Sequence, residues 1–115
     1  MEALANSKNA VEGGKSLRQI YFGTYDLTVH TKPEVDSMAL AREIYLDILG
    51  IERINGTNIG ANLGHLVGYD AGYYGYMWSL VFATDMFESR FKKEGIMNPK
   101  TGMDYRNMIL GPGIH

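Results

Sequence analysis

The chain of 115 residues contains no cysteine, which excludes a disulfide framework and any site built on a thiolate. Positive charge is not in excess either, because 11 Lys and Arg face 13 Asp and Glu and the formal net charge is −2. This balance argues against a nucleic-acid partner. Long hydrophobic runs are also missing, and no stretch reaches the roughly 18 apolar residues that a membrane span needs. The N-terminus, residues 1–6, lacks the basic start and apolar core of a signal peptide, so we expect a cytoplasmic protein without a membrane partner.

What remains is the composition of an ordinary globular protein, with 45% hydrophobic and 21% charged residues. A chain of this length can bury a modest core. We therefore expect a single domain over residues 1–115, held together by packing alone.

Capping residues, glycines and prolines divide the chain into segments with helical periodicity. The sequence predicts an all-α fold, a small bundle of four to five helices with a Gly-rich loop before a long central helix. The first helix would run from Met1 to about Val11 and stop at Gly13-Gly14. The second would run from Leu17 to about His30, before Pro33, although its many β-forming residues leave a strand as the alternative.

The next helix should begin after Asp36 or Ser37 as N-cap and end at Leu49, with Gly50 as a left-handed stop. Residues 51–69 then form a connection rich in Gly and Asn, and a connection of this length is usually functional or mobile.

The long helix should follow Asp70 as N-cap and reach about Glu94, where Gly95 closes it. Its first half is apolar nearly all round, so we expect that half to be buried or covered by a partner. A final helix should start at Pro99 after Asn98 and end at residues 111–113.

Residues 64–78 concentrate the chemistry of the chain. They hold one imidazole, four glycines and four tyrosines: His65, Gly64, Gly68, Gly72, Gly75, Tyr69, Tyr73, Tyr74 and Tyr76. Glycine lets a backbone bend and approach another group closely, whereas tyrosine offers an apolar face and a hydroxyl group. This combination predicts a hydrated aromatic surface that binds a peptide or another polar organic molecule.

The same segment, Gly-His-Leu-Val-Gly-Tyr-Asp-Ala-Gly-Tyr-Tyr-Gly-Tyr-Met-Trp-Ser, resembles the C-terminal region of the thimet oligopeptidase and neurolysin family of zinc endopeptidases. The resemblance covers about residues 4–112. Its further matching segments are residues 17–19, 29–31, 48–50, 56–58, 85–87, 90–99 and 102–106.

The zinc-binding motif of that family, His-Glu-x-x-His with a downstream glutamate, does not occur in the chain. Two imidazoles one helical turn apart bind the zinc ion, and the glutamate between them activates water. This chain has only His30, His65 and His115, and none of them stands in such a motif. By the resemblance, the catalytic helix would lie before residue 1. We therefore expect no metal, no cofactor and no enzymatic activity.

The resemblance implies that His65, Tyr69, Tyr73 and Tyr76 are substrate contacts, and that Tyr76 faced the scissile carbonyl. Without zinc these groups can bind a peptide but have no nucleophile to assist. The segment also departs from the family, because Gly68 stands alone where two glycines are usual. The alternative is that the tyrosines pack a re-purposed core or interface.

The resulting hypothesis is a non-catalytic binding protein with a peptide or a protein receptor as partner. The alternative is a fragment or subunit that supplies the peptide-binding surface of a zinc metallopeptidase. We also expect a homodimer that buries the apolar stripe Tyr76, Leu80 and Phe87 or the stripe beside it. A second resemblance, to a small cysteine-free fungal protein that tastes sweet, would imply binding to a taste receptor.

Overall fold

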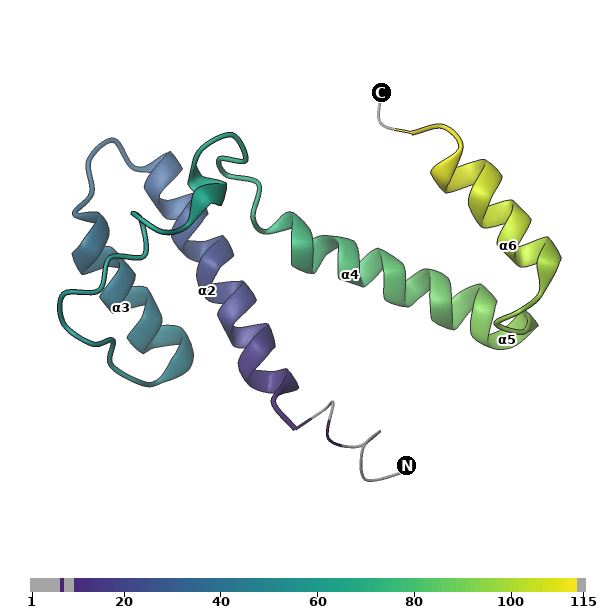
Figure 1. The fold of residues 1–115 in the computed structure, drawn as a ribbon, viewed down its shortest axis with the longest axis horizontal. Helices are drawn as coiled ribbons and strands as arrows, with labels where there is room; N and C mark the ends of the chain where they lie inside the picture. The colour runs from purple at the N-terminus through teal and green to yellow at the C-terminus, as the bar shows by residue number, and fades with distance from the viewer. Residues whose placement is uncertain (1–6, 8–9, 114–115) are drawn as a thin grey trace. The chain divides into compact units, whose positions relative to one another are not determined.

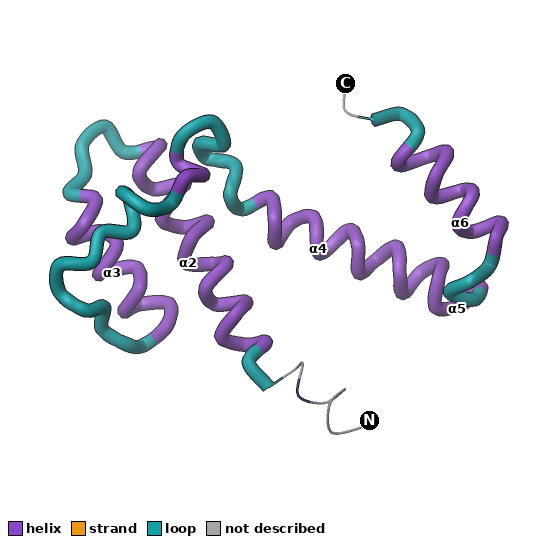
Figure 2. Tube along the Cα trace, in the orientation of Figure 1, coloured by secondary structure: helices purple, strands orange, loops and turns teal. Residues whose placement is uncertain are grey.

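The computed structural model describes residue 7 and residues 10–113, which form helices, turns and loops (Figure 1). No strand occurs among these residues, so the all-α prediction is confirmed (Figure 2). The internal contacts divide the chain into two compact units, residues 1–77 and 78–115. The single domain over residues 1–115 stays a prediction. The helix expected from Met1 to Val11 lies largely outside the described residues.

The first unit is built on two helices, α2 (Glu12–Thr31) and α3 (Ser37–Leu49), which lie side by side (Figure 1). Tyr21 and Tyr25 of α2 are fully buried, and they are one helical turn apart. Leu40 and Ala41 of α3 are also buried, and they form one core cluster with Tyr25. The aromatic residues of α2 therefore make up most of this core.

The strand alternative for this segment was wrong, and so was the expected helix start at Leu17. The β-forming residues instead recur at helical spacing, so that Tyr21, Phe22 and Tyr25 share one buried face. Gly13-Gly14 does not stop a helix but lies in the first turn of α2, where the propensity cost of glycine is about 1 kcal/mol per residue. Burial of the aromatic face outweighs this cost. The helix ends before Pro33, as predicted.

The boundaries of α3 confirm the sequence prediction. The carboxylate of Asp36 accepts hydrogen bonds from the N–H groups of Met38 and Ala39, both at 3.0 Å, and so caps the helix. Gly50 follows Leu49 with φ of 71°, a left-handed conformation that glycine adopts without strain.

The connection after α3 is anchored to the core of the first unit. Ile59, Leu63 and Leu66 pack against the buried cluster around Tyr25. The short 3₁₀ helix η1 (Gly64–Leu66) then presents His65. This stretch of loop is thus a structural layer over α2.

The long helix begins later than predicted. It consists of α4 (Gly75–Met86), the π-helical segment η2 (Phe87–Phe91) and α5 (Lys92–Glu94), and Gly95 ends it as expected. Asp70 is not its N-cap, because residues 70–74 form turns and Ala71 adopts φ of 56°, which interrupts a right-handed helix.

None of the residues of α4 is buried, and Trp78 is 60% exposed. The predicted burial of this apolar half is therefore wrong within the described chain, and its coverage by a partner stays a prediction. The reason is that no other described helix packs extensively against α4.

The second unit ends with α6 (Pro99–Tyr105) and the π-helical segment η3 (Arg106–Leu110), as the sequence predicts. The side chain of Asn98 caps α6 by accepting from the N–H of Lys100 at 2.9 Å. The ring of Tyr105 meets that of Phe91 edge to face, with centroids 5.9 Å apart. This contact packs α6 against the end of η2.

Candidate functional site

All four residues singled out by the sequence come together in the first unit and form one aromatic cluster: His65, Tyr69, Tyr73 and Tyr76. The imidazole of His65 lies at its centre, with ring centroids 6.1 Å from Tyr69, 4.9 Å from Tyr73 and 5.7 Å from Tyr76. Tyr76 also contacts Tyr73, at 5.0 Å, and Tyr69, at 6.0 Å. Edge-on and tilted ring pairs at these distances attract one another. The roles of these residues as ligand contacts stay predictions.

One hydrogen bond joins the two residues of the cluster that lie furthest apart in sequence. Nε2 of His65 and the hydroxyl group of Tyr76 are 3.1 Å apart. In one imidazole tautomer the phenol donates to Nε2, and in the other Nε2–H donates to the phenol oxygen. The pair can therefore offer an incoming polar group either a donor or an acceptor.

The aromatic cluster has a buried floor and an exposed rim. Tyr73 is only 6% exposed, whereas Tyr69 is 48% and Tyr76 is 51% exposed. Burial raises the pKa of Tyr73, and its ring packs against the buried ring of Phe22 with centroids 5.3 Å apart. The floor is thus held by the core while the rim faces solvent.

Gly72 lies where the loop folds back on Tyr69. A Cβ atom at Gly72 would lie 3.1 Å from the backbone oxygen of Tyr69 and 3.2 Å from its ring. Such contacts are tighter than most Cβ contacts in proteins, so a side chain here would shift Tyr69 by a few tenths of an ångström. Glycine at residue 72 therefore allows the close approach of Tyr69 to the loop.

Sequence reasoning missed the residue that holds this loop in place, which is Asp26 of α2. Its side chain is fully buried. Oδ1 accepts a hydrogen bond from the N–H of Ala71 at 3.1 Å, and Oδ2 accepts one from the N–H of Tyr73 at 3.0 Å. A buried carboxylate must be satisfied in this way. The available signal was a single acidic residue on the apolar face of the helix.

His30 completes this arrangement one helical turn after Asp26. Its Nδ1 lies 2.8 Å from the backbone oxygen of Asp26 and 3.0 Å from the carboxylate. The hydrogen bond to that backbone oxygen raises the pKa of His30 above its usual value, and the nearby charges of Asp26 and Asp70 act in the same direction. The protonated imidazole therefore pairs with the buried anion.

Zinc chemistry does not fit the residues that the structure describes. Among them, no group of three or more His, Asp or Glu side chains could hold a metal ion. Nδ1 of His30 is engaged by Asp26, and Nε2 of His65 by Tyr76, so each of these two imidazoles already has a protein partner. None of the helices that the structure describes has the length and the apolar character that a membrane span requires.

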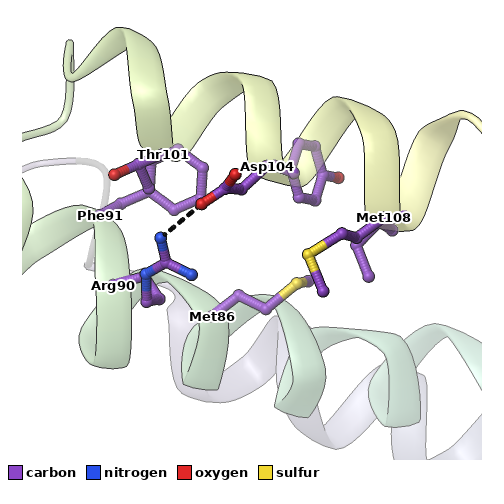
Figure 3. Close-up of a pocket in the computed structure, with 8 residues that line it drawn as sticks. Met86, Arg90, Phe91, Thr101, Asp104 and Met108 are labelled. Atoms are coloured by element: carbon purple, nitrogen blue, oxygen red, sulfur yellow. Dashed lines mark hydrogen bonds and ion pairs between the residues drawn. The ribbon is translucent and has the colours of Figure 1, made fainter.

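The second unit contains an apolar pocket that the sequence did not point to (Figure 3). It has a volume of about 160 Å³, and Met86, Phe91 and Met108 form part of its wall. Arg90 donates a hydrogen bond to Asp104 at 3.0 Å across one end. Hydrogen bonds with Glu94 and Asp104 raise the pKa of Arg90. The Arg90–Asp104 pair joins η2 to α6, whereas the Arg90–Glu94 pair links η2 to the adjoining α5.

Comparison with known proteins identifies relatives over almost the whole chain. Saccharolysin of Saccharomyces cerevisiae is 37% identical over 106 residues, which are 85% of this chain and 14% of that protein. Thimet-like oligopeptidase of Dictyostelium discoideum is 34% identical over 117 residues, covering 98% of this chain and 17% of the relative. Oligopeptidase A of Escherichia coli is 35% identical over 103 residues, which are 84% of this chain and 15% of that protein.

The chain thus spans about a sixth of the length of these curated relatives. The resemblance to a sweet-tasting protein finds no support in these matches, whereas the resemblance to the oligopeptidases is confirmed. The family model of peptidase family M3 matches residues 1–114. The chain therefore belongs to peptidase family M3.

Proposed function

We propose that the chain binds short peptides at its aromatic cluster and does not hydrolyse them by itself. The observation that carries this proposal is the convergence of His65, Tyr69, Tyr73 and Tyr76 around one hydrogen bond, between His65 and Tyr76 at 3.1 Å. The relatives are named oligopeptidases, which supports a peptide as the ligand class.

The chemistry of the cluster suits a peptide backbone. The hydroxyl group of Tyr76 and the imidazole of His65 can donate to a carbonyl oxygen or accept from an N–H group. The exposed ring of Tyr69 offers an apolar face to a neighbouring side chain of the peptide. The buried Tyr73 keeps the floor rigid, so little conformational entropy is lost on binding.

The absence of turnover follows from the chemistry rather than from the binding surface. A hydrogen-bond donor lowers the barrier to peptide hydrolysis only when a nucleophile attacks the same carbonyl group. Among the described residues, no cluster suited to a metal ion provides an activated water molecule. The cluster would then hold a peptide and release it unchanged.

A second candidate function is supply of this peptide-binding surface to a larger zinc peptidase. The exposed apolar side chains of α4 favour it, because such a surface suits contact with further protein mass. In that case turnover would appear only when a zinc-bearing part is added.

The test is a titration of the ¹⁵N-labelled chain with the neutral peptide acetyl-Gly-Gly-Phe-Gly-Gly-amide, followed by NMR. We expect backbone amide shifts of residues 64–76. Tyr76→Phe removes the hydroxyl group but keeps the ring, and should weaken binding about 5-fold, the value of one net hydrogen bond. Tyr74→Phe is the matched control, because Tyr74 is equally exposed but lies outside the cluster.

Hydrolysis is followed by mass spectrometry on the same samples, with zinc added and with a chelator. Intact peptide under both conditions supports binding without turnover. Chelator-sensitive cleavage by the chain alone would overturn the non-catalytic proposal. Shifts that avoid residues 64–76, or equal affinities of Tyr76→Phe and the unaltered chain, would overturn the assignment of the site.

A further inference from the structure

A separate cleft of about 540 Å³ lies in the first unit, where Tyr21 and Phe22 form part of its wall. Its wall comes from α2, from the end of α3 and from the connection that follows α3. The lining residues that matter here are Arg18, Tyr21, Phe22, Tyr45, Leu49 and Arg53. The volume falls within the range of small-molecule sites.

Arg53 is held in a defined position at this cleft. Its Nη1 donates a hydrogen bond to the hydroxyl group of Tyr21 at 2.9 Å, and its Nε donates to Oγ1 of Thr57 at 3.4 Å. The centre of the guanidinium lies 5.0 Å from the ring centroid of Tyr45, a cation–π contact. Since a guanidinium has five N–H groups, most of them remain available to a ligand.

Arg18 provides a second guanidinium on the same cleft. It lies over the ring of Phe22, 4.9 Å from the centroid. Within the part of the chain that the structure describes, neither Arg18 nor Arg53 forms an ion pair. Two cations that rest on aromatic rings without a carboxylate partner create a positive potential at the mouth of an apolar cleft.

We propose that this cleft binds an organic monocarboxylate with an apolar body, through the guanidinium groups of Arg18 and Arg53. The planar fork of arginine matches a carboxylate in a bidentate arrangement. The apolar side chains of Phe22, Leu49 and Ile59 line the cleft and would cover the body of the ligand.

An acidic residue in the wall of this cleft favours a ligand with one negative charge over a ligand with two. Glu52 also lines the cleft, so its carboxylate opposes a phosphate dianion more strongly than a carboxylate monoanion. An inorganic anion would also leave the apolar wall uncovered. A monocarboxylate with an apolar body therefore fits this cleft better than a phosphate does.

The test compares 4-phenylbutyrate with its neutral isostere 4-phenylbutanamide, each titrated into the full chain at pH 7 and followed by NMR. We expect 4-phenylbutyrate to shift the Nε–H signal of Arg53 and the backbone amides of residues 51–59. Its affinity should be about 10-fold higher than that of the amide, because the amide cannot pair with the guanidinium groups. Inorganic phosphate at the same concentration should not displace it.

Two variants test whether each arginine binds the carboxylate of the ligand. Arg18→Gln and Arg53→Gln should each weaken 4-phenylbutyrate binding about 5- to 10-fold and leave the weaker amide binding unchanged. Arg106→Gln is the matched control, because Arg106 is an exposed arginine of the second unit. Tyr76→Phe should also leave the affinity for 4-phenylbutyrate unchanged, so the result for this cleft does not depend on the result for the peptide site.

Equal affinities for the acid and the amide would overturn the proposal, as would displacement by phosphate or an unchanged affinity of Arg18→Gln. Because Arg53 also bonds to Tyr21, Arg53→Gln could disturb the fold, which the dispersion of its amide spectrum reports. Arg18 is exposed and its guanidinium lies over the ring of Phe22 without a hydrogen bond to the core that the structure describes, so Arg18→Gln decides the outcome even then.

Discussion

Oδ2 of Asp26 accepts a hydrogen bond from the backbone N–H of Tyr73 at 3.0 Å, across 47 positions of sequence. Through this bond the buried face of α2 determines where the floor of the aromatic cluster lies. The same carboxylate accepts from Ala71, whose left-handed conformation turns the chain toward α4. One acidic side chain thus links the core to the candidate site.

Replacing Asp26 by Asn should destabilise the first unit by about 2–4 kcal/mol, because hydrogen bonds to a charged group contribute roughly 1.5–3 kcal/mol each. The amide keeps one acceptor oxygen, but it turns an NH₂ group toward the second backbone donor. Urea denaturation followed by circular dichroism measures the change. Peptide binding should weaken too, since Tyr73 loses its anchor.

The matched control for this change is Asp47→Asn. Asp47 is an exposed acidic residue of α3, so its replacement should alter stability by less than about 0.5 kcal/mol. Equal effects of the two substitutions would contradict the role of Asp26 as an anchor.

The pairing of His30 with Asp26 predicts a pH dependence of stability. The folded-state pKa of His30 is raised, first by the hydrogen bond to the backbone oxygen of Asp26 and then by the charges of Asp26 and Asp70. A raised pKa means that protonation favours the folded state. The contribution is therefore complete below the unfolded pKa, near 6.5, and is lost as pH rises through the folded value.

Comparison of the unaltered chain with His30→Gln isolates this contribution, because the two proteins differ only at residue 30. We expect the difference between their urea midpoints to be largest below about pH 6 and to decrease as the pH rises toward 9. A difference that stays constant over this range, or that increases with pH, would show that the charge of His30 does not stabilise the fold.

The sequence was sufficient to predict the elements whose ends carry a local chemical signal. Asp36 and Gly50 are the cap residues of α3, and Asn98 with Pro99 begins α6. The side chains of Asp36 and Asn98 accept hydrogen bonds from free N–H groups at the start of a helix, and Gly50 ends its helix in a left-handed conformation. Local patterns are enough for features of this kind. The four residues of the aromatic cluster, from His65 to Tyr76, were instead indicated by the resemblance to the oligopeptidases.

Features that depend on distant partners could not be predicted in this way. The start of α4 at Gly75 rather than Asp70 follows from the bonds of Asp26 to Ala71 and Tyr73, which no local pattern reveals. Gly13-Gly14 lies within α2 because tertiary packing outweighs the low helix propensity of glycine. The cleft at Arg53 likewise depends on contacts with Tyr21 and Tyr45 from two other helices.

Gly60 is a position where any side chain should be harmful. A Cβ atom there would lie 2.8 Å from the hydroxyl oxygen of Tyr25, and Tyr25 is fully buried and has little room to move. We expect Gly60→Ala to lower the free energy of unfolding by about 1–3 kcal/mol, the usual cost of overpacking. Thermal denaturation measures this loss.

Gly13→Ala is the control for this substitution. No atom lies within 4 Å of the added Cβ, and the residue is helical, so alanine should stabilise α2 by about 0.5–1 kcal/mol. If both variants shifted the melting temperature in the same direction, the proposed clash with Tyr25 would be wrong.

We propose that two copies of the chain associate as a homodimer through α4. Tyr76 and Leu80 of α4 are more than half exposed, and together with the exposed Phe87 they make up the apolar stripe that the sequence predicts. Burying such a surface contributes about 25 cal/mol per Å², and a two-fold axis would use each side chain twice. We expect sedimentation velocity at micromolar concentration to show a dimer.

Leu80→Glu should raise the dissociation constant of this dimer at least 10-fold, because one charge from each copy enters the interface. Asn55→Glu is the matched control, since it makes the same charge change on an exposed loop and should leave the dissociation constant unchanged. A monomer at 100 µM, or equal effects of the two variants, would contradict the homodimer through α4.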